Sequence, residues 1–274
     1  MSEEVCEGIK KVDDGLQEDI KSTGVSSEDI LYIDYCPKKN GQKRQCETNS
    51  EKISAGVLWL LSTFENIRDE QVSENEKNQY AEYAILFLSS KIYKILNKES
   101  ITLKDFYAKH IKNNKGNTTF NDHIKNKINS MTIDIKDISK FYEALQFLCK
   151  MYNENDDESP NCEQYSKDVD DFVKIFKELN DDSNVTKDSL YYKIWSTLST
   201  DYDHFKKYYA EKCRDCSNIP DLPSIKTSQN SLESSGLTSM QSSEVTSQNS
   251  SIASKLIPTL LIFAILILLG IAYK

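Results

Sequence analysis

Cysteine is the residue type with the most definite chemistry in this chain, because thiols can pair as disulfides or bind metal ions. The 274 residues contain seven cysteines, all before residue 217: Cys6, Cys36, Cys46, Cys149, Cys162, Cys213 and Cys216. Cys36 and Cys46 flank a Lys/Asn/Gly-rich loop that a bridge could close. Cys149 and Cys162 flank an acidic turn between two predicted helices, where a bridge would staple a helical hairpin. With one cysteine unpaired, about 105 pairing schemes exist, so the full connectivity stays open.

Disulfides would also indicate the compartment, because they persist only under oxidising conditions. Bridged cysteines predict a domain outside the cytosol, whereas seven buried free thiols would fit a reduced cytosolic protein. The pair Cys213-Arg-Asp-Cys216 could also bind zinc or act in redox chemistry. Zinc needs a second pair or nearby histidines, and a redox pair needs a βαβ context. The sequence offers neither, so we interpret all seven cysteines as disulfide candidates.

Patterns typical of catalytic or cofactor-binding sites are missing from the sequence. The histidines are His110, His123 and His204, and none belongs to an HExxH motif. No GxSxG, Walker or GxGxxG motif occurs. We therefore predict no enzymatic activity, no catalytic residues, no metal site and no cofactor.

Three further features could indicate a binding partner or a modification, but each is weak evidence. The net charge of -9 argues against a nucleic-acid partner, which requires a basic surface. A small basic loop could touch anionic sugars or phospholipids, although charges in a turn are usually only solvated; it contains Lys38, Lys39, Lys43 and Arg44. Three N-glycosylation sequons matter only if the domain is lumenal; they begin at Asn117, Asn184 and Asn249.

The elements that must position these residues are predicted to be helices. Apolar side chains recur at intervals of three and four in eight stretches: 5–20, 53–67, 81–95, 103–111, 120–131, 135–152, 165–179 and 190–209. Each stretch fits one face of an amphipathic helix, and Ser50 is placed to cap the second. No long stretch alternates in the manner of a strand. Residues 1–216 therefore predict an all-α, cysteine-containing domain of about eight helices.

Two further segments follow the helical domain. In 217–254, 16 of the 38 residues are Ser or Thr and none is aromatic. Such a segment cannot bury enough apolar surface to fold, so it is predicted to be a disordered stalk. Residues 255–274 contain an apolar run bracketed by Lys255 and Lys274. At about 1.5 Å per residue this run matches the bilayer thickness, so we predict a single transmembrane helix with the lipid bilayer as its partner.

The orientation of this helix is ambiguous on the sequence alone. One lysine at each end gives no positive-inside asymmetry. The acidic N-terminus, MSEEVCEGIKKVDDG, has no apolar region of a signal peptide, which favours a tail-anchored protein with a cytosolic domain. Small residues such as Ser242 and Ser243 before the apolar tail also allow a glycolipid-anchor signal. The cysteines instead favour a domain outside the cytosol.

Distinctive strings are spread along the whole chain. They are Tyr35–Pro37 (YCP), Lys52–Leu61 (KISAGVLWLL), Ile138–Leu145 (ISKFYEAL), Leu148–Glu154 (LCKMYNE), Phe176–Asp181 (FKELND), Leu198–Phe205 (LSTDYDHF), Ser250–Leu256 (SSIASKL) and Leu269–Lys274 (LGIAYK). In these strings the sequence resembles the Plasmodium interspersed repeat (PIR) family, the Cir/Bir/Yir variant antigens of rodent malaria parasites. The scarcity of arginine agrees with an AT-rich source, because only Arg44, Arg68 and Arg214 occur.

The resemblance implies a variant antigen with a helical cysteine-containing domain, a low-complexity stalk and a C-terminal transmembrane helix. Members of the family lack an ordinary N-terminal signal, and some are exported into or onto the infected red cell. The resemblance therefore implies an exoplasmic domain on a single-pass protein of the infected red cell, parasite or vacuole membrane. Members usually carry a short basic tail after the helix, where this sequence ends at Lys274.

The function that the resemblance implies is antigenic variation, immune evasion or interaction with an unknown host protein or cell-surface ligand. Loops at 36–46, 68–79, 112–119 and 153–160 are predicted to vary without disturbing the helical scaffold. The alternative is a tail-anchored cytosolic helical adaptor or trafficking protein, which predicts free thiols.

Overall fold

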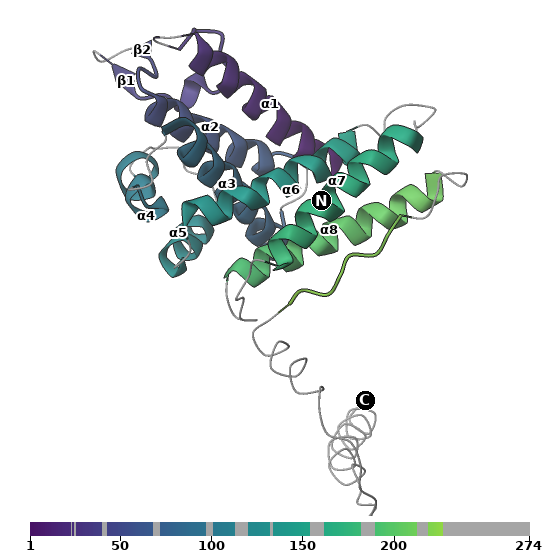
Figure 1. Ribbon diagram of the computed structural model, residues 1–274. Coiled ribbons are helices and arrows are strands. Elements are labelled where there is room, and N and C mark those ends of the chain that lie inside the picture. Colours follow the sequence, from purple (N-terminus) through teal and green to yellow (C-terminus); the bar gives the residue numbers. More distant parts are fainter. Residues whose placement is uncertain are drawn as a thin grey trace, which may run out of the picture. The chain divides into compact units, whose positions relative to one another are not determined.

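The computed structural model describes residues 1–22, 24, 26–39, 43–67, 72–96, 101–112, 120–131, 134–153, 162–181, 190–212 and 219–226. All of them belong to one unit, Met1–Ser234, whose described part we call the head. Eight α-helices dominate it (Figure 1): α1 (Glu3–Lys21), α2 (Asn49–Glu65), α3 (Glu74–Leu96), α4 (Leu103–Phe106), α5 (Asn121–Ser130), α6 (Ile135–Asn153), α7 (Cys162–Asp181) and α8 (Leu190–Lys212). The smaller elements are a 3-10 helix η1 (Ile33–Tyr35), a π-helix η2 (Tyr107–Ile111) that continues α4, and two short strands, β1 (Lys38–Lys39) and β2 (Lys43–Arg44).

The eight helices coincide with the eight apolar stretches, which confirms the all-α prediction for the described head. Two details differ. The cap of α2 is Thr48 rather than Ser50, because the Thr48 side chain accepts from the Glu51 amide and the Glu51 carboxylate accepts from the Thr48 amide. The predicted loop 68–79 is too long, because α3 already begins at Glu74.

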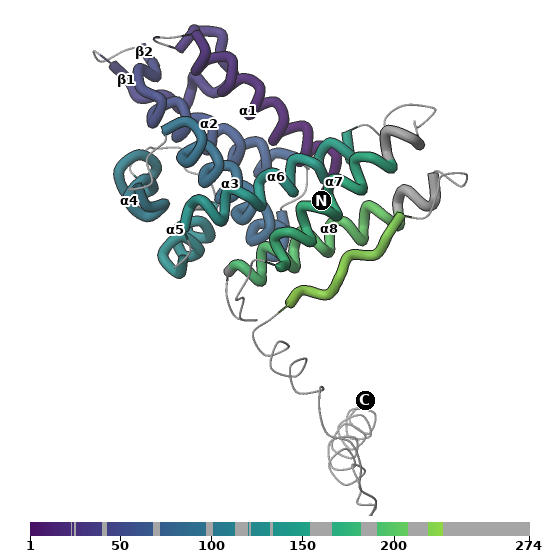
Figure 2. The backbone as a smooth tube through the Cα atoms, in the orientation of Figure 1, coloured from purple at the N-terminus to yellow at the C-terminus, as the bar shows by residue number. Residues whose placement is uncertain are grey.

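Four long helices form the centre of the head, with α1 packed on α2, α2 on α3, α3 on α6 and α6 on α1. Helices α1 and α2 run antiparallel, since Lys52 near the start of α2 pairs with Asp19 near the end of α1, while Gly8 lies beside Thr63. Helices α7 and α8 pack on α6, and α5 packs on α3 (Figure 2). The closed arrangement of four helices holds most of the buried side chains.

Aromatic side chains join α7 and α8 to α6. Trp195 of α8 meets Phe141 of α6 edge-on, with 5.6 Å between ring centroids, and meets Phe176 of α7 at 4.1 Å. Phe172 of α7 stacks on Tyr202 of α8 at 5.0 Å. Such aromatic pairs add about 0.5–1.5 kcal/mol each beyond the burial of their area. The last two helices are therefore an integral part of the head.

Residues 219–226 form an extended strap that lies along α7 and α8 (Figure 1). The Asn180 side chain of α7 binds it twice, donating to the Ser224 carbonyl at 3.0 Å and accepting from the Lys226 amide at 2.8 Å. Its apolar side chains pack on the core; they are Ile219, Leu222 and Ile225. The Ser/Thr-rich composition of 217–254 predicts that these residues belong to the stalk. The ordered head instead continues to Lys226, because the strap has both apolar contacts and hydrogen-bond partners on the helices.

No helix among the described residues is both long and apolar enough to cross a bilayer. The predicted membrane segment 255–274 and the stalk after Lys226 lie outside the described residues. So do all but the first residue of the predicted loops 112–119 and 153–160.

Candidate functional site

One disulfide joins Cys6 near the start of α1 to Cys149 in the last turns of α6, with the two Cα atoms 4.8 Å apart. Both cysteines are buried. This bridge excludes the possible pairing of Cys149 with Cys162 across the acidic turn. The packing of α1 against α6 brings together cysteines that are 143 positions apart, a contact that spacing along the chain does not indicate.

The second disulfide joins Cys36 to Cys46, the pair that flanks the Lys/Asn/Gly-rich loop. It closes the base of the β1–β2 hairpin, and its Cα atoms are 5.1 Å apart. The side chain of Cys162 lies outside the described part of the chain, as do Cys213, Cys216 and the sequon residues Asn117, Asn184 and Asn249.

The basic loop of the β1–β2 hairpin is partly neutralised by acidic neighbours. Lys39 forms ion pairs with Glu47 at 3.3 Å and Glu51 at 3.0 Å. Lys43 forms an ion pair with Glu28. Cations that already have acidic partners attract a polyanion weakly, so the geometry favours a solvated hairpin over a polyanion site.

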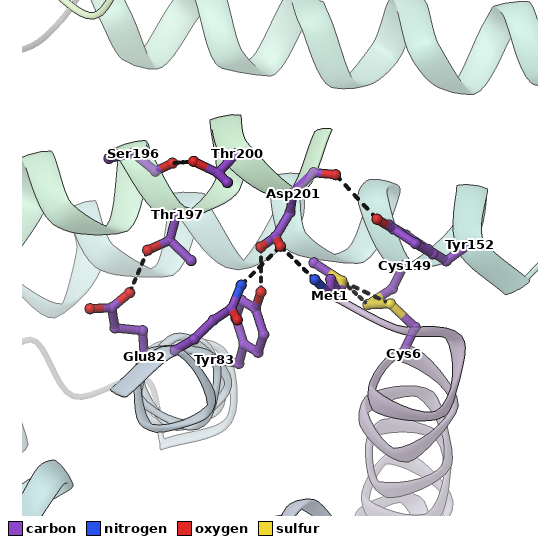
Figure 3. A network of polar contacts seen from close by, with 11 residues as sticks. Met1, Cys6, Glu82, Tyr83, Cys149, Tyr152, Ser196, Thr197, Thr200 and Asp201 are labelled. Atoms are coloured by element: carbon purple, nitrogen blue, oxygen red, sulfur yellow. Dashed lines mark hydrogen bonds and ion pairs between the residues drawn. A yellow bond between two sulfur atoms is a disulfide. The ribbon is translucent and has the colours of Figure 1, made fainter. Parts of the chain in front are cut away.

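Asp201 of α8 is fully buried and connects several elements (Figure 3). Its carboxylate accepts hydrogen bonds from the Met1 amino group at 2.7 Å, from Gln79 at 2.9 Å and from the Tyr83 hydroxyl. Its backbone carbonyl accepts from the Tyr152 hydroxyl at 3.2 Å. Burial raises the pKa of Asp201, and the Met1 amine and Tyr83 oppose that rise. Because its partners come from α3, α6 and the N-terminus, this hydrogen-bond network links α8 to the rest of the head and has a structural role.

A groove of about 500 Å³ runs between α1 and α6, with Asp13 among its lining residues. The Asp13 carboxylate accepts hydrogen bonds from Tyr142 at 2.9 Å and Gln146 at 2.7 Å, both on α6. It also accepts from Gln17 of its own helix at 3.0 Å and from Lys91 of α3. Four donors satisfy this buried carboxylate, as the burial of a charged group requires.

The charge state of Asp13 follows from the same contacts. Burial by itself would raise its pKa, but the Lys91 ammonium and the hydrogen bonds from Lys91, Gln17 and Tyr142 hold the pKa below its usual value. A carboxylate that is ionised at neutral pH and has its acceptor positions in use is a poor proton carrier. The geometry therefore favours a structural role for Asp13.

The two buried carboxylates of α1, Asp13 and Asp19, are not among the residues that we predicted from the sequence to be functional. Asp19 accepts hydrogen bonds from the hydroxyls of Ser26 and Tyr32, each at 2.6 Å, and pairs with Lys52 at 3.3 Å. A signal was present, because both residues lie at three- or four-residue intervals within the apolar stretch 5–20. An acidic residue on the apolar face of a predicted helix indicates a buried partner of opposite charge.

A second groove, of about 400 Å³, lies on another face of α1, against α2. Its floor is narrow, because a Cβ atom on Gly8 would lie 3.3 Å from the Thr63 methyl. Trp59 of α2 lines it and is partly exposed. Glu7 and Lys11 of α1 line it as an exposed ion pair at 2.6 Å.

Within the described residues, no group of three or more His, Cys, Asp or Glu side chains could hold a metal ion. The described residues form a disulfide-bonded, all-α domain. Its surface carries the two grooves described above, one between α1 and α6 and one between α1 and α2.

The chain belongs to the family described as Plasmodium variant antigen protein Cir/Yir/Bir, whose model matches residues 6–274. It is also similar to a solved structure described as "Structure of a Plasmodium PIR protein ectodomain". The two chains are 40% identical with a TM-score of 0.64, over 81% of this chain and 99% of that chain. No curated protein sequence matches the chain. Family membership confirms the PIR resemblance and supports the general role of a variant surface antigen.

Proposed function

We propose that this protein is a membrane-anchored surface antigen that displays its helical head on the exoplasmic side, in antigenic variation, immune evasion or host-cell interaction. The observation that carries the proposal is the presence of two disulfides in the head of a variant antigen family member. Disulfides persist in oxidising compartments. The description of the solved relative as an ectodomain supports the same side of the membrane.

The anchor in this proposal is the apolar segment 255–274, which is long enough to span a bilayer. The Ser/Thr-rich residues 227–254 serve as the spacer between anchor and head. The membrane is that of the infected red cell, the parasite or the vacuole, and the partner of the head is a host protein or cell-surface ligand.

The head acts by presentation and binding rather than by catalysis. The helical core and the Cys6–Cys149 bridge keep the scaffold in place, while exposed segments can change in sequence. The hairpin between Cys36 and Cys46 is an example, because the bridge fixes both of its ends while Lys38, Lys43 and Arg44 are exposed.

The rival function, a tail-anchored cytosolic adaptor, predicts that all seven cysteines are free thiols. The two disulfides disfavour it, because the cytosol keeps thiols reduced.

Counting thiols in the denatured, unreduced protein isolated from infected cells separates the two functions. Four of the seven cysteines are bridged, so we expect at most three reactive thiols per chain. Seven reactive thiols would overturn exoplasmic display. Protease treatment of intact infected cells then tests the location: cleavage in the spacer supports red-cell surface display, and protection until the red-cell membrane is opened assigns the parasite or vacuole membrane.

A further inference from the structure

We infer that the groove between α1 and α2 is a docking site for a protein partner that presents a basic segment, with a lysine or arginine side chain lying against Trp59. This inference rests on the proposed function, because it names the class of partner that the displayed head binds. The docking inference and the proposed display function can fail separately, because peptide binding is measured on purified protein and display is measured on cells.

The shape of the groove suits an inserted side chain. Gly8 and Thr63 bring the two antiparallel helices close together at its floor. The hollow has a volume of about 400 Å³, and its aromatic and apolar lining residues are Tyr35, Trp59 and Ile67. A narrow floor between two helices, with aromatic side chains beside polar ones such as Ser62 and Asn66, suits a partner segment that carries both apolar and polar groups.

Trp59 is the main apolar contact that the groove offers. Its neighbours on α2, Leu58 and Leu60, are fully buried, whereas Trp59 is partly exposed. The second tryptophan, Trp195, is 1% exposed in the aromatic core. Tryptophan is the residue type most enriched among interface residues with large binding contributions, so an exposed tryptophan in a groove favours a binding surface.

The charge of the groove selects a basic partner. The wall on α1 carries the carboxylates of Glu4 and Glu7 and the ammonium group of Lys11. Lys11 and Glu7 are 59% and 56% exposed, so their ion pair is weak and an incoming cation can replace Lys11 at little cost. A long basic side chain places its alkyl stem on apolar surface and its cation over an aromatic face.

Other occupants fit less well. A second copy of this chain has the same net charge of -9, which opposes association. Anionic lipid and nucleic acid are repelled by the carboxylates of the groove. The larger groove between α1 and α6 has no excess of carboxylates, because Lys10 and Lys150 balance Asp13 and Asp14 among its lining residues.

The test uses the full-length chain in a nonionic detergent. In the Trp195→Phe variant Trp59 is the only tryptophan, so its fluorescence reports on the groove alone. The probes are a short peptide of alternating arginine and alanine and the same peptide with glutamate for arginine. We expect a saturable change in Trp59 emission with the arginine peptide and no change with the glutamate peptide. Calorimetry on the unmutated chain repeats the titration in case Trp195→Phe does not fold.

Two variants with a matched control decide the location of binding. Trp59→Ala should weaken binding at least about tenfold in calorimetry, the loss typical of a central interface residue. Glu7→Gln should weaken it by a smaller factor. Asp14→Asn removes a similarly exposed carboxylate, from the Lys10–Asp14 pair of α1, and should leave binding unchanged.

Three outcomes would overturn the inference. Absence of saturation would mean that the groove has no basic occupant. Equal losses for Glu7→Gln and Asp14→Asn would mean that the peptide binds the acidic surface in general. Sedimentation could instead show a dimer of this chain that Trp59→Ala converts to monomers. That result would mean that the groove binds a second copy of the chain.

Discussion

Asp13 of α1 and Lys91 of α3 form an ion pair inside the head, although 78 positions separate them in the sequence. Each side chain is 6% exposed. Moving two charges out of water costs free energy that only a good pair with additional hydrogen bonds can offset. Tyr142 and Gln146 supply such bonds from α6, so the pair connects three helices.

Asp13→Asn should lower the free energy of unfolding by about 3–5 kcal/mol, because Lys91 would stay buried without its counter-charge. Urea denaturation followed by circular dichroism at neutral pH measures the change. Asp14→Asn is the control, because it breaks an exposed pair of the same helix with Lys10 and should cost less than about 1 kcal/mol. Similar losses in the two variants would contradict a buried, energetically important pair.

The contribution of Asp13 to the free energy of unfolding should decrease in acid. Its folded pKa lies below the ordinary value of 3.8, so ionised Asp13 stabilises the fold fully above pH 3.8. That contribution is lost as the pH falls through the lower, folded pKa. The stability difference between the unmutated protein and Asp13→Asn should therefore be constant near neutrality and shrink in acid. A difference that grows in acid would refute the assigned sign.

The two disulfides should differ in their effect on stability. The chain-entropy model predicts about 5 kcal/mol for the bridge Cys6–Cys149, which spans 143 positions, and about 3 kcal/mol for Cys36–Cys46, which spans 10. Paired Cys→Ser variants measured by thermal and urea denaturation test this order. Mass spectrometry of unreduced peptides tests the connectivity directly, and a Cys149–Cys162 peptide would contradict it.

The strap 219–226 should open more often when the Asn180 side chain, which makes two of its hydrogen bonds, is removed. Asn180→Ala deletes both hydrogen bonds to the strap, which should lower the free energy of local opening by about 1–3 kcal/mol. Hydrogen exchange of peptides covering the strap should then become faster, with α1 unchanged. Asp221→Asn, which breaks only an exposed pair with Lys206, should leave the exchange rate unchanged. Uniformly faster exchange across the head would mean that Asn180 supports the whole fold.

Local patterns in the sequence predicted those features that depend on near neighbours in the chain. The position of every described helix followed from apolar side chains at intervals of three and four. The bridge between Cys36 and Cys46 followed from a short loop with a cysteine at each end. The family resemblance followed from strings such as Lys52–Leu61, and the family comparison confirmed it.

Features that join distant parts of the chain were missed or wrongly assigned. Cys149 has a cysteine nearby in sequence, but its partner is Cys6 on another helix. The position of Asp13 on an apolar helix face indicates burial, but its partner Lys91 lies on another helix, 78 positions away. The groove beside Trp59 exists only because α1 and α2 approach closely at Gly8.

By itself, therefore, the sequence determined the all-α head and the family. The tertiary structure decided which of the described cysteines pair, which charges are buried and that residues 219–226 pack on the helices. The physical reason is the range of the interactions. A helix is set by hydrogen bonds and side-chain spacing within a few residues, whereas a disulfide or buried ion pair depends on which helix faces pack together.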